Sequence, residues 1–228
     1  MKAMILAAGY GKRLQPLTEK TPKPMLLAAG KPLLQHHIER LAAAGVSELV
    51  INTSWLAEQI EEYFGDGSRF GVSISWSREP EPLETGGGLA HALPLLGKQP
   101  FLLINGDIWT DFPLLSAVNY QLVKERSAWL LMVENPQHNP KGDFGVIDGL
   151  VSYKPESKFT FSGISILRPQ LIVDYAAKYA GQAFFPLRDL LRMAIEAQQV
   201  GGSVYQGHWC DVGTVSRYQQ LNSLLSSS

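Results

Sequence analysis

Cysteine is almost absent from this chain, because Cys210 is the only one among 228 residues. A single thiol cannot form an internal disulfide, and it argues against a cysteine-based zinc site. Disulfides persist mainly in oxidising compartments, so their absence favours a reducing one. We therefore expect a cytoplasmic protein.

Long hydrophobic runs and an excess of one charge are also lacking. The apolar run at Met4–Ala7 is too short for the core of a signal peptide or for a membrane span. The formal net charge is −1, which argues against binding nucleic acid or a membrane through bulk charge. We expect small-molecule substrates, no nucleic-acid or membrane partner, and a monomer or homodimer.

Hydrophobic residues nevertheless make up 45% of the chain, enough for a substantial core. Short apolar runs alternate with segments of helical spacing through the first two-thirds of the chain. The expected strands are 4–7, 48–52, 72–76, 101–105 and 128–133, and the expected helices include 88–96 and 113–125. This order predicts an α/β fold with a Rossmann-like, mostly parallel sheet flanked by helices.

From Asn135 onward the pattern changes. Short strands at 144–147, 151–154 and 159–167 lie between Gly, Pro and Asp turns and predict a small antiparallel addition. Helices at 169–179 and 186–199, a strand at 203–206 and a helix at 215–225 complete the expected order.

A basic, glycine-rich loop, AAGYGKRLQPLTEKTPKPM (residues 7–25), follows the first strand. Glycines allow backbone N–H groups to approach a phosphate closely, and basic side chains add charge. The dinucleotide-binding pattern fails because Leu14 stands where a third glycine belongs. Pro22 and Pro24 restrict the backbone on both sides of Lys23 and hold its side chain in one direction. A solvated basic loop is the competing interpretation.

Three further segments carry candidate chemistry. Asn105-Gly106-Asp107 follows a buried strand, where open α/β sheets bind ligands, although such a segment is often only a turn. Trp209 to Thr214 (WCDVGT) reads as a strand-to-helix turn with Thr214 as the helix cap. Glu84 to Ala90 (ETGGGLA) places three glycines before an expected helix, as a ligand contact or as a hinge.

Together these segments resemble the sugar-1-phosphate nucleotidyltransferases, whose signature is G-x-G-x-R-L-x-P-L-T…P-K-P. The resemblance covers essentially the whole chain and implies a nucleotidyltransferase (GT-A-like) fold. In that family a sugar phosphate attacks the α-phosphorus of a nucleoside triphosphate and expels pyrophosphate. The resemblance implies that Arg13 holds the triphosphate, that Lys23 neutralises the reacting phosphates, and that Asp107 completes the catalytic set.

The resemblance also assigns the remaining site residues. Asp107 and Asp211 would bind Mg²⁺. The nucleotide-binding residues would be Ala7, Ala8, Gly9, Gly11, Lys12, Arg13, Lys23, Glu84, Thr85, Gly87, Gly88, Asn105 and Asp107. The sugar-binding residues would be Asp143, Gly145, Lys154, Ser162 and Gly163. Tyr153-Lys154-Pro155 stands where many relatives carry E-K-P, so the glutamate of that motif is missing. We expect a single domain, with residues 1–134 as the nucleotide-binding core and 135–228 as the sugar-binding and closing part.

Within the family, the segments ETGGGLAHAL, NGDIWTD, GDFGVI and TFSGI most resemble the members that convert UTP and N-acetylmuramate α-1-phosphate into UDP-N-acetylmuramate during peptidoglycan recycling of the bacterial cell wall. Mannose-1-phosphate guanylyl transfer and glucose-1-phosphate thymidylyl or uridylyl transfer are the alternatives. Two more distant alternatives are a glycosyltransferase and a non-catalytic binding subunit. A glycosyltransferase normally carries D-x-D, whereas Asp107 and Asp111 stand four positions apart here.

Overall fold

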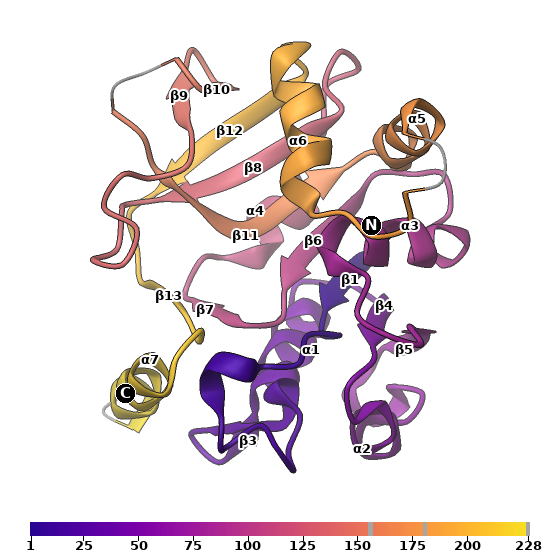
Figure 1. The fold of residues 1–228 in the computed structure, drawn as a ribbon, viewed down its shortest axis with the longest axis vertical. Helices are drawn as coiled ribbons and strands as arrows, with labels where there is room; N and C mark the ends of the chain where they lie inside the picture. Colours follow the sequence, from indigo (N-terminus) through magenta and orange to yellow (C-terminus); the bar gives the residue numbers. More distant parts are fainter. Residues whose placement is uncertain (155–156, 180–181, 227–228) are drawn as a thin grey trace.

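A computed structural model describes residues 1–154, 157–179 and 182–226, and a central sheet dominates it (Figure 1). Nine strands of the described chain form this sheet in the order β5-β4-β1-β6-β11-β8-β12-β10-β9. In that order their bounds are Ser73–Arg78, Glu48–Thr53, Ala3–Leu6, Phe101–Asn105, Thr160–Leu167, Ala128–Val133, Val200–Tyr205, Leu150–Ser152 and Gly145–Ile147.

The sheet is mixed and mostly parallel, which confirms the predicted fold class. β5, β4, β1 and β6 run parallel, and β12 is parallel to β8. β11 is antiparallel to both of its neighbours, β6 and β8. β9 and β10 form a hairpin that continues the sheet at the edge of β12.

The prediction that residues 159–167 belong to a small antiparallel addition was wrong. β11 lies in the middle of the main sheet and is buried along almost its whole length. A strand covered on both faces needs apolar or small residues on both sides, and TFSGISIL supplies them. The antiparallel addition is the β9–β10 hairpin alone.

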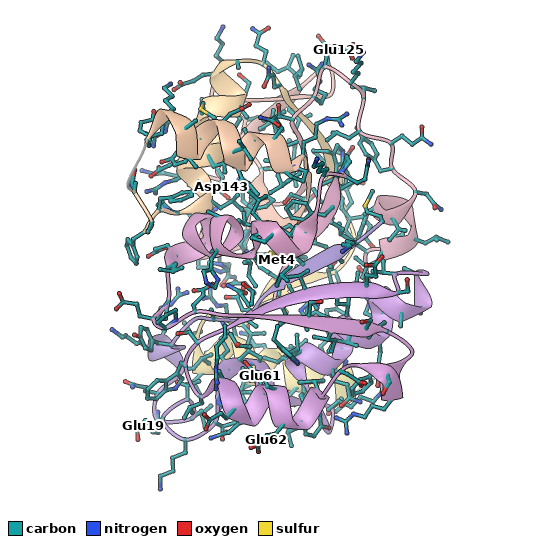
Figure 2. The ribbon with its side chains drawn as sticks, turned by 90° about the vertical axis from the view of Figure 1, so that its right-hand side faces the viewer. Met4, Glu19, Glu61, Glu62, Glu125 and Asp143 are labelled. Atoms are coloured by element: carbon teal, nitrogen blue, oxygen red, sulfur yellow. The ribbon has the colours of Figure 1, made fainter. Side chains whose placement is uncertain are left out.

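Helices cover both faces of the sheet, as the strand and helix alternation predicts. The helices are α1 (Leu33–Ala43), α2 (Ala57–Phe64), α3 (Glu84–Leu96), α4 (Leu114–Val118), α5 (Pro169–Lys178), α6 (Leu187–Glu196) and α7 (Val215–Ser226). Ile5 of β1 packs with α1, α2 and α4, whereas its neighbour Met4 packs with α3, α5 and α6. Figure 2 shows Met4 beneath α3. None of the helices in the described part of the chain is long and apolar enough to cross a membrane.

The expected helix over 113–125 ends early, at Val118. In the segment that follows, backbone carbonyl groups accept hydrogen bonds from Arg168 instead of from the N–H groups of a continuing helix. The Arg168 guanidinium donates to the carbonyl oxygens of Leu122 and Arg126, both at 2.8 Å. Val123, which fits the helical spacing, is exposed.

Two short strand pairs stand outside the main sheet (Figure 1). β7 (Ile108–Thr110) pairs with β13 (Trp209–Asp211), and β2 (Leu27–Ala28) pairs with β3 (Lys31–Pro32). The sequence patterns predicted neither pair. The α7 helix packs against β2 around buried Leu221, so the end of the described chain lies beside the loop that follows β1.

Candidate active site

A cavity of about 560 Å³ opens at the carboxyl ends of β1, β4, β5 and β6. This is the place where open parallel sheets bind ligands. Most of the residues predicted to bind nucleotide line it, namely Ala7, Ala8, Gly9, Gly11, Lys12, Arg13, Lys23, Glu84, Thr85, Asn105 and Asp107. Gly87 and Gly88 lie outside this lining.

The basic loop enters the cavity through a turn that only glycine fits. Gly11 has φ 65°, in the left-handed region, and a Cβ there would lie 2.9 Å from the Thr18 methyl group. Its carbonyl oxygen accepts hydrogen bonds from Leu14 N and the Thr18 hydroxyl, both at 2.8 Å. These contacts begin a 3-10 turn over Lys12–Leu14, which places Lys12 and Arg13 at the cavity.

Lys23 projects from a proline-bounded turn directly onto Asp107. The turn spans Lys23–Met25, with Pro22 before it and Pro24 within it. The Lys23 ammonium lies 2.7 Å from Asp107 Oδ2, and the Lys23 side chain is only 12% exposed. Partial burial opposes ionisation of Asp107, but Lys23 and then Arg13 outweigh it and hold the pKa of Asp107 below its ordinary value.

The loop after β6 places Asp107 against the loop after β1. A Cβ on Gly106 would lie 2.5 Å from the Leu6 carbonyl oxygen, to which the Gly106 N–H donates at 2.9 Å. The two strand ends can approach this closely because residue 106 has no side chain. Asp107 therefore stands at the base of the basic loop.

The β7–β13 pair brings the backbone at Asp211 beside that at Asp107, although the two lie 104 positions apart in the sequence. Asp211 pairs with Ile108, and the Val212 N–H donates to the Asp107 carbonyl oxygen at 2.6 Å. Asp211 itself does not line the cavity, but Gly213, two residues further on, does.

The two oxygens of Asp211 each lie near a basic side chain. Its Oδ2 lies 3.1 Å from the Arg217 guanidinium. Its Oδ1 is buried and makes no hydrogen bond within the described structure, although His138 Nε2 lies 3.0 Å away. Mg²⁺ is usually held by one or two carboxylates plus substrate phosphates. Asp107 lines the cavity, and the backbone at Asp211 lies beside it, so these two residues supply carboxylates of this kind.

The three glycines at 86–88 lie inside α3, so the prediction that they precede the helix was wrong. The N–H groups of Gly86 and Gly87 both donate to the Phe185 carbonyl oxygen, at 2.9 and 3.0 Å. A Cβ on Gly86 would collide with the Phe185 ring, and one on Gly87 with the Ala183 carbonyl oxygen. These glycines therefore hold the segment before α6 against the first turn of α3.

Several cavity residues went unrecognised in the sequence. Tyr10, Asn52, Glu79, Pro82 and Phe184 all line the cavity. Asn52 and Glu79 stand at the carboxyl ends of β4 and β5. The same position at a strand end led to the prediction of Asn105 and could have indicated these two residues as well. Asn105 lines the cavity, and its Oδ1 is buried without a hydrogen-bond partner in the described structure.

The predicted sugar-binding residues lie apart from the cavity lining, around β9, β10 and β11. Asp143 Oδ2 accepts the Phe161 N–H at 2.8 Å, and Ser162 Oγ accepts the Ile164 N–H at 3.1 Å. A Cβ on Gly163, at φ 82°, would lie 2.8 Å from the Asn105 amide. Gly145 begins β9 and Lys154 follows β10, whereas Pro155 lies outside the described residues. Gly163 thus connects this region to the cavity through Asn105.

Comparison with known proteins identifies the class that this fold and site define. The family described as "Nucleotidyl transferase" matches residues 2–228. The chain therefore belongs to the nucleotidyl transferase family and is an enzyme of that family.

Two individual relatives are named for sugar 1-phosphates, and a similar solved structure is named for UDP-glucose. The N-acetylmuramate alpha-1-phosphate uridylyltransferase of Neisseria meningitidis serogroup B is 47% identical over 231 residues, which cover 98% of each chain. The mannose-1-phosphate guanylyltransferase catalytic subunit beta of Danio rerio is 34% identical over 93% of this chain, which spans 61% of that protein. A UDP-glucose pyrophosphorylase solved with UDP-glucose superposes with a TM-score of 0.81 at 22% identity, covering 99% of this chain and 98% of that one.

Proposed function

We propose that this enzyme transfers a uridylyl group from UTP to N-acetylmuramate α-1-phosphate, giving UDP-N-acetylmuramate and pyrophosphate. The geometry that supports nucleotidyl transfer is the cavity where Arg13, Lys23 and Asp107 meet. The 47% identity with the Neisseria uridylyltransferase, over nearly the full length of both chains, supports this choice of nucleotide and sugar.

The reaction needs no covalent nucleophile from the protein. The phosphate oxygen of the sugar is already charged and attacks the α-phosphorus of UTP in line with the departing pyrophosphate. Positioning and charge neutralisation then carry the catalysis. Lys23 neutralises charge on the reacting phosphates from its fixed turn, and Arg13 binds the triphosphate and the leaving group.

The proposal includes Mg²⁺ held by Asp107 and Asp211. When bound, the ion neutralises phosphate charge and orients the triphosphate. Two observations support these ligands: Asp107 lines the cavity, and the backbone of the β7–β13 pair runs beside it at Asp211. Arg217 and Lys23 hold one oxygen of each carboxylate in place.

The proposal also covers the cellular role of the enzyme and the residues that contact the sugar. A single cysteine and the resemblance to cell-wall recycling enzymes suit a cytoplasmic role in recycling peptidoglycan sugars. For the sugar we propose contacts from Asp143, Gly145, Lys154, Ser162 and Gly163, of which Gly163 lies against Asn105.

Mannose-1-phosphate guanylyl transfer is the second candidate, favoured by the 34% identity with the Danio rerio subunit. A substrate panel separates the two. The purified enzyme is given each nucleoside triphosphate with each sugar 1-phosphate and Mg²⁺, and pyrophosphate release is measured. Fastest release with UTP and N-acetylmuramate α-1-phosphate supports the proposal, and fastest release with GTP and mannose 1-phosphate overturns it.

A further inference from the structure

Two exposed aromatic side chains meet at the cavity. Tyr10 lines the cavity and is 41% exposed, and Trp55, two residues beyond β4, is 37% exposed. Their ring centres lie 5.8 Å apart at an interplanar angle of 57°. Because each residue keeps more than a third of its surface in water, the burial of apolar area contributes little to holding the rings there. The groups that the pair contacts are therefore more informative than the area that it buries.

Trp55 also contacts the basic loop. Its indole Nε1–H donates to the Thr18 carbonyl oxygen at 3.2 Å. Gln59, in the first turn of α2, donates to the Lys20 carbonyl oxygen, also at 3.2 Å. The start of α2 thus holds the loop through two backbone carbonyl groups, and the Trp55 ring is fixed beside Tyr10.

Tyr10 in turn contacts a lysine. The left-handed turn at Gly11 separates Tyr10 from Lys12, and the Lys12 ammonium lies 5.1 Å from the centre of the Tyr10 ring. A cation within about 6 Å of an aromatic ring is attracted by its π electrons. Lys12 forms no ion pair among residues 1–154, 157–179 and 182–226. The ring therefore restrains this ammonium while its charge stays available to an anion.

We propose that Tyr10, held by Trp55, is a positioning residue that directs Lys12 toward the β- and γ-phosphates of the triphosphate, an inference that rests on the proposed function. Lys12 lines the same cavity as Lys23, but Lys12 is exposed whereas the Lys23 side chain is only 12% exposed. Lys23 serves the reacting α-phosphate at depth, and Lys12 serves the phosphates nearer to solvent, which leave as pyrophosphate. A lysine that is restrained in advance loses less side-chain entropy when it binds.

A double-mutant cycle tests the coupling between Tyr10 and Lys12 on the full-length enzyme, with Kd for UTP measured by calorimetry. Lys12→Gln should raise Kd by about tenfold, as the loss of a hydrogen bond to a charged group does. Tyr10→Leu should raise it by about threefold, the size of an exposed cation–π contact, and Tyr10→Phe should keep the wild-type value. Tyr10→Leu should have no further effect in the Lys12→Gln background.

Two comparisons separate this role from a purely structural one. Pyrophosphate should bind more weakly to Tyr10→Leu than to wild type, whereas UMP, which lacks the β- and γ-phosphates, should bind equally well to both. Tyr63→Leu is the matched control, because Tyr63 is 40% exposed and its ring also carries a cation, Arg69 at 4.5 Å, but it lies outside the cavity lining. Its Kd for UTP should equal that of wild type.

Several results would overturn the inference. An unchanged Kd for UTP in folded Tyr10→Leu would do so, and so would equal effects of this change in the wild-type and Lys12→Gln backgrounds. UMP binding weakened as much as UTP binding would place the contact away from the outer phosphates. A Tyr10→Phe variant as weak as Tyr10→Leu would assign the effect to the hydroxyl group. If UTP is not the substrate, the proposed function fails, and the same cycle with pyrophosphate still decides the inference.

Discussion

The Lys23 ammonium lies 2.7 Å from Asp107 Oδ2, which joins the loop after β1 to the loop after β6. The pair sits at the cavity, with the Lys23 side chain 12% and the Asp107 side chain 36% exposed. A free lysine side chain has many rotamers, and the contact with Asp107 restricts Lys23 to one of them before a nucleotide arrives. A bound triphosphate would give the ammonium a second set of anionic partners.

Removing either member of this pair should abolish turnover. We expect Lys23→Ala and Asp107→Ala each to lower kcat by about a thousandfold or more, as loss of a main electrostatic contact to a reacting phosphate does. Pyrophosphate release measures the rate, and circular dichroism checks the fold. Near-normal activity in either folded variant would contradict the site assignment.

Arg217 should stabilise the protein by keeping the Asp211 charge paired. The side chains of Arg217 and Asp211 are 16% and 19% exposed. Arg217→Met should lower the free energy of unfolding by about 2–4 kcal/mol, because the pair is largely though not fully buried and its loss leaves the Asp211 carboxylate without its arginine. Urea unfolding measures this. Adding Asp211→Asn to Arg217→Met should recover part of the loss, and a strictly additive double variant would refute the coupling.

His37 should make stability depend on pH. It lies buried in α1, where burial first, then Arg40 and His36, lower its pKa to about 4. In the unfolded chain a histidine has a pKa of about 6.5, so the unfolded state binds the proton more readily than the folded state does. The stability from neutral His37 is therefore present above about pH 6.5 and lost as pH falls towards 4, by up to about 3 kcal/mol.

Replacing His37 should remove that dependence. Urea unfolding of wild type and His37→Gln is compared at intervals from pH 7 to pH 4. The difference in unfolding free energy between the two proteins should shift in favour of the variant as pH falls. A difference that stays constant with pH would show that His37 does not titrate in this way.

Gly88→Ala should destabilise the enzyme although alanine is the better helix former. Alanine gains about 1 kcal/mol over glycine within a helix. Its Cβ would lie 2.6 Å from Glu79 Oε1 and 2.8 Å from Asn52 Nδ2, and overpacking costs about 1–3 kcal/mol. We expect a lower Tm and weaker UTP binding. Gly9→Ala, where a Cβ meets no atom within 4 Å, should keep the wild-type Tm. Equal Tm values for both variants would contradict the packing argument.

Local chemistry made part of this site predictable from sequence. The turn at Gly11 and the prolines around Lys23 act through a few neighbouring residues, so the loop could be recognised as a phosphate-binding candidate. The nearness of Asp211 to Asp107 depends on the β7–β13 pair, which no spacing in the sequence specifies. Only the family resemblance indicated it.

Tertiary packing decided what the sequence patterns missed. Three consecutive glycines favour a loop by propensity, but contacts with Phe185 hold Gly86 and Gly87 in the first turn of α3. The place of β11 between β6 and β8 depends on sheet order, whereas hydrophobic periodicity reports only that a strand exists. The sequence patterns did not single out Glu79, which is buried and hydrogen-bonded to Asn52 and Leu83.

The central claim is uridylyl transfer, and the fate of the α-phosphorus tests it most directly. The enzyme is incubated with Mg²⁺, N-acetylmuramate α-1-phosphate and UTP labelled at the α-phosphorus. The products are then separated and identified by mass spectrometry. We expect the label to appear in UDP-N-acetylmuramate together with an equal amount of pyrophosphate, and Lys23→Ala to form neither. Label that stays in UTP with this acceptor, while another sugar 1-phosphate is converted, would contradict it.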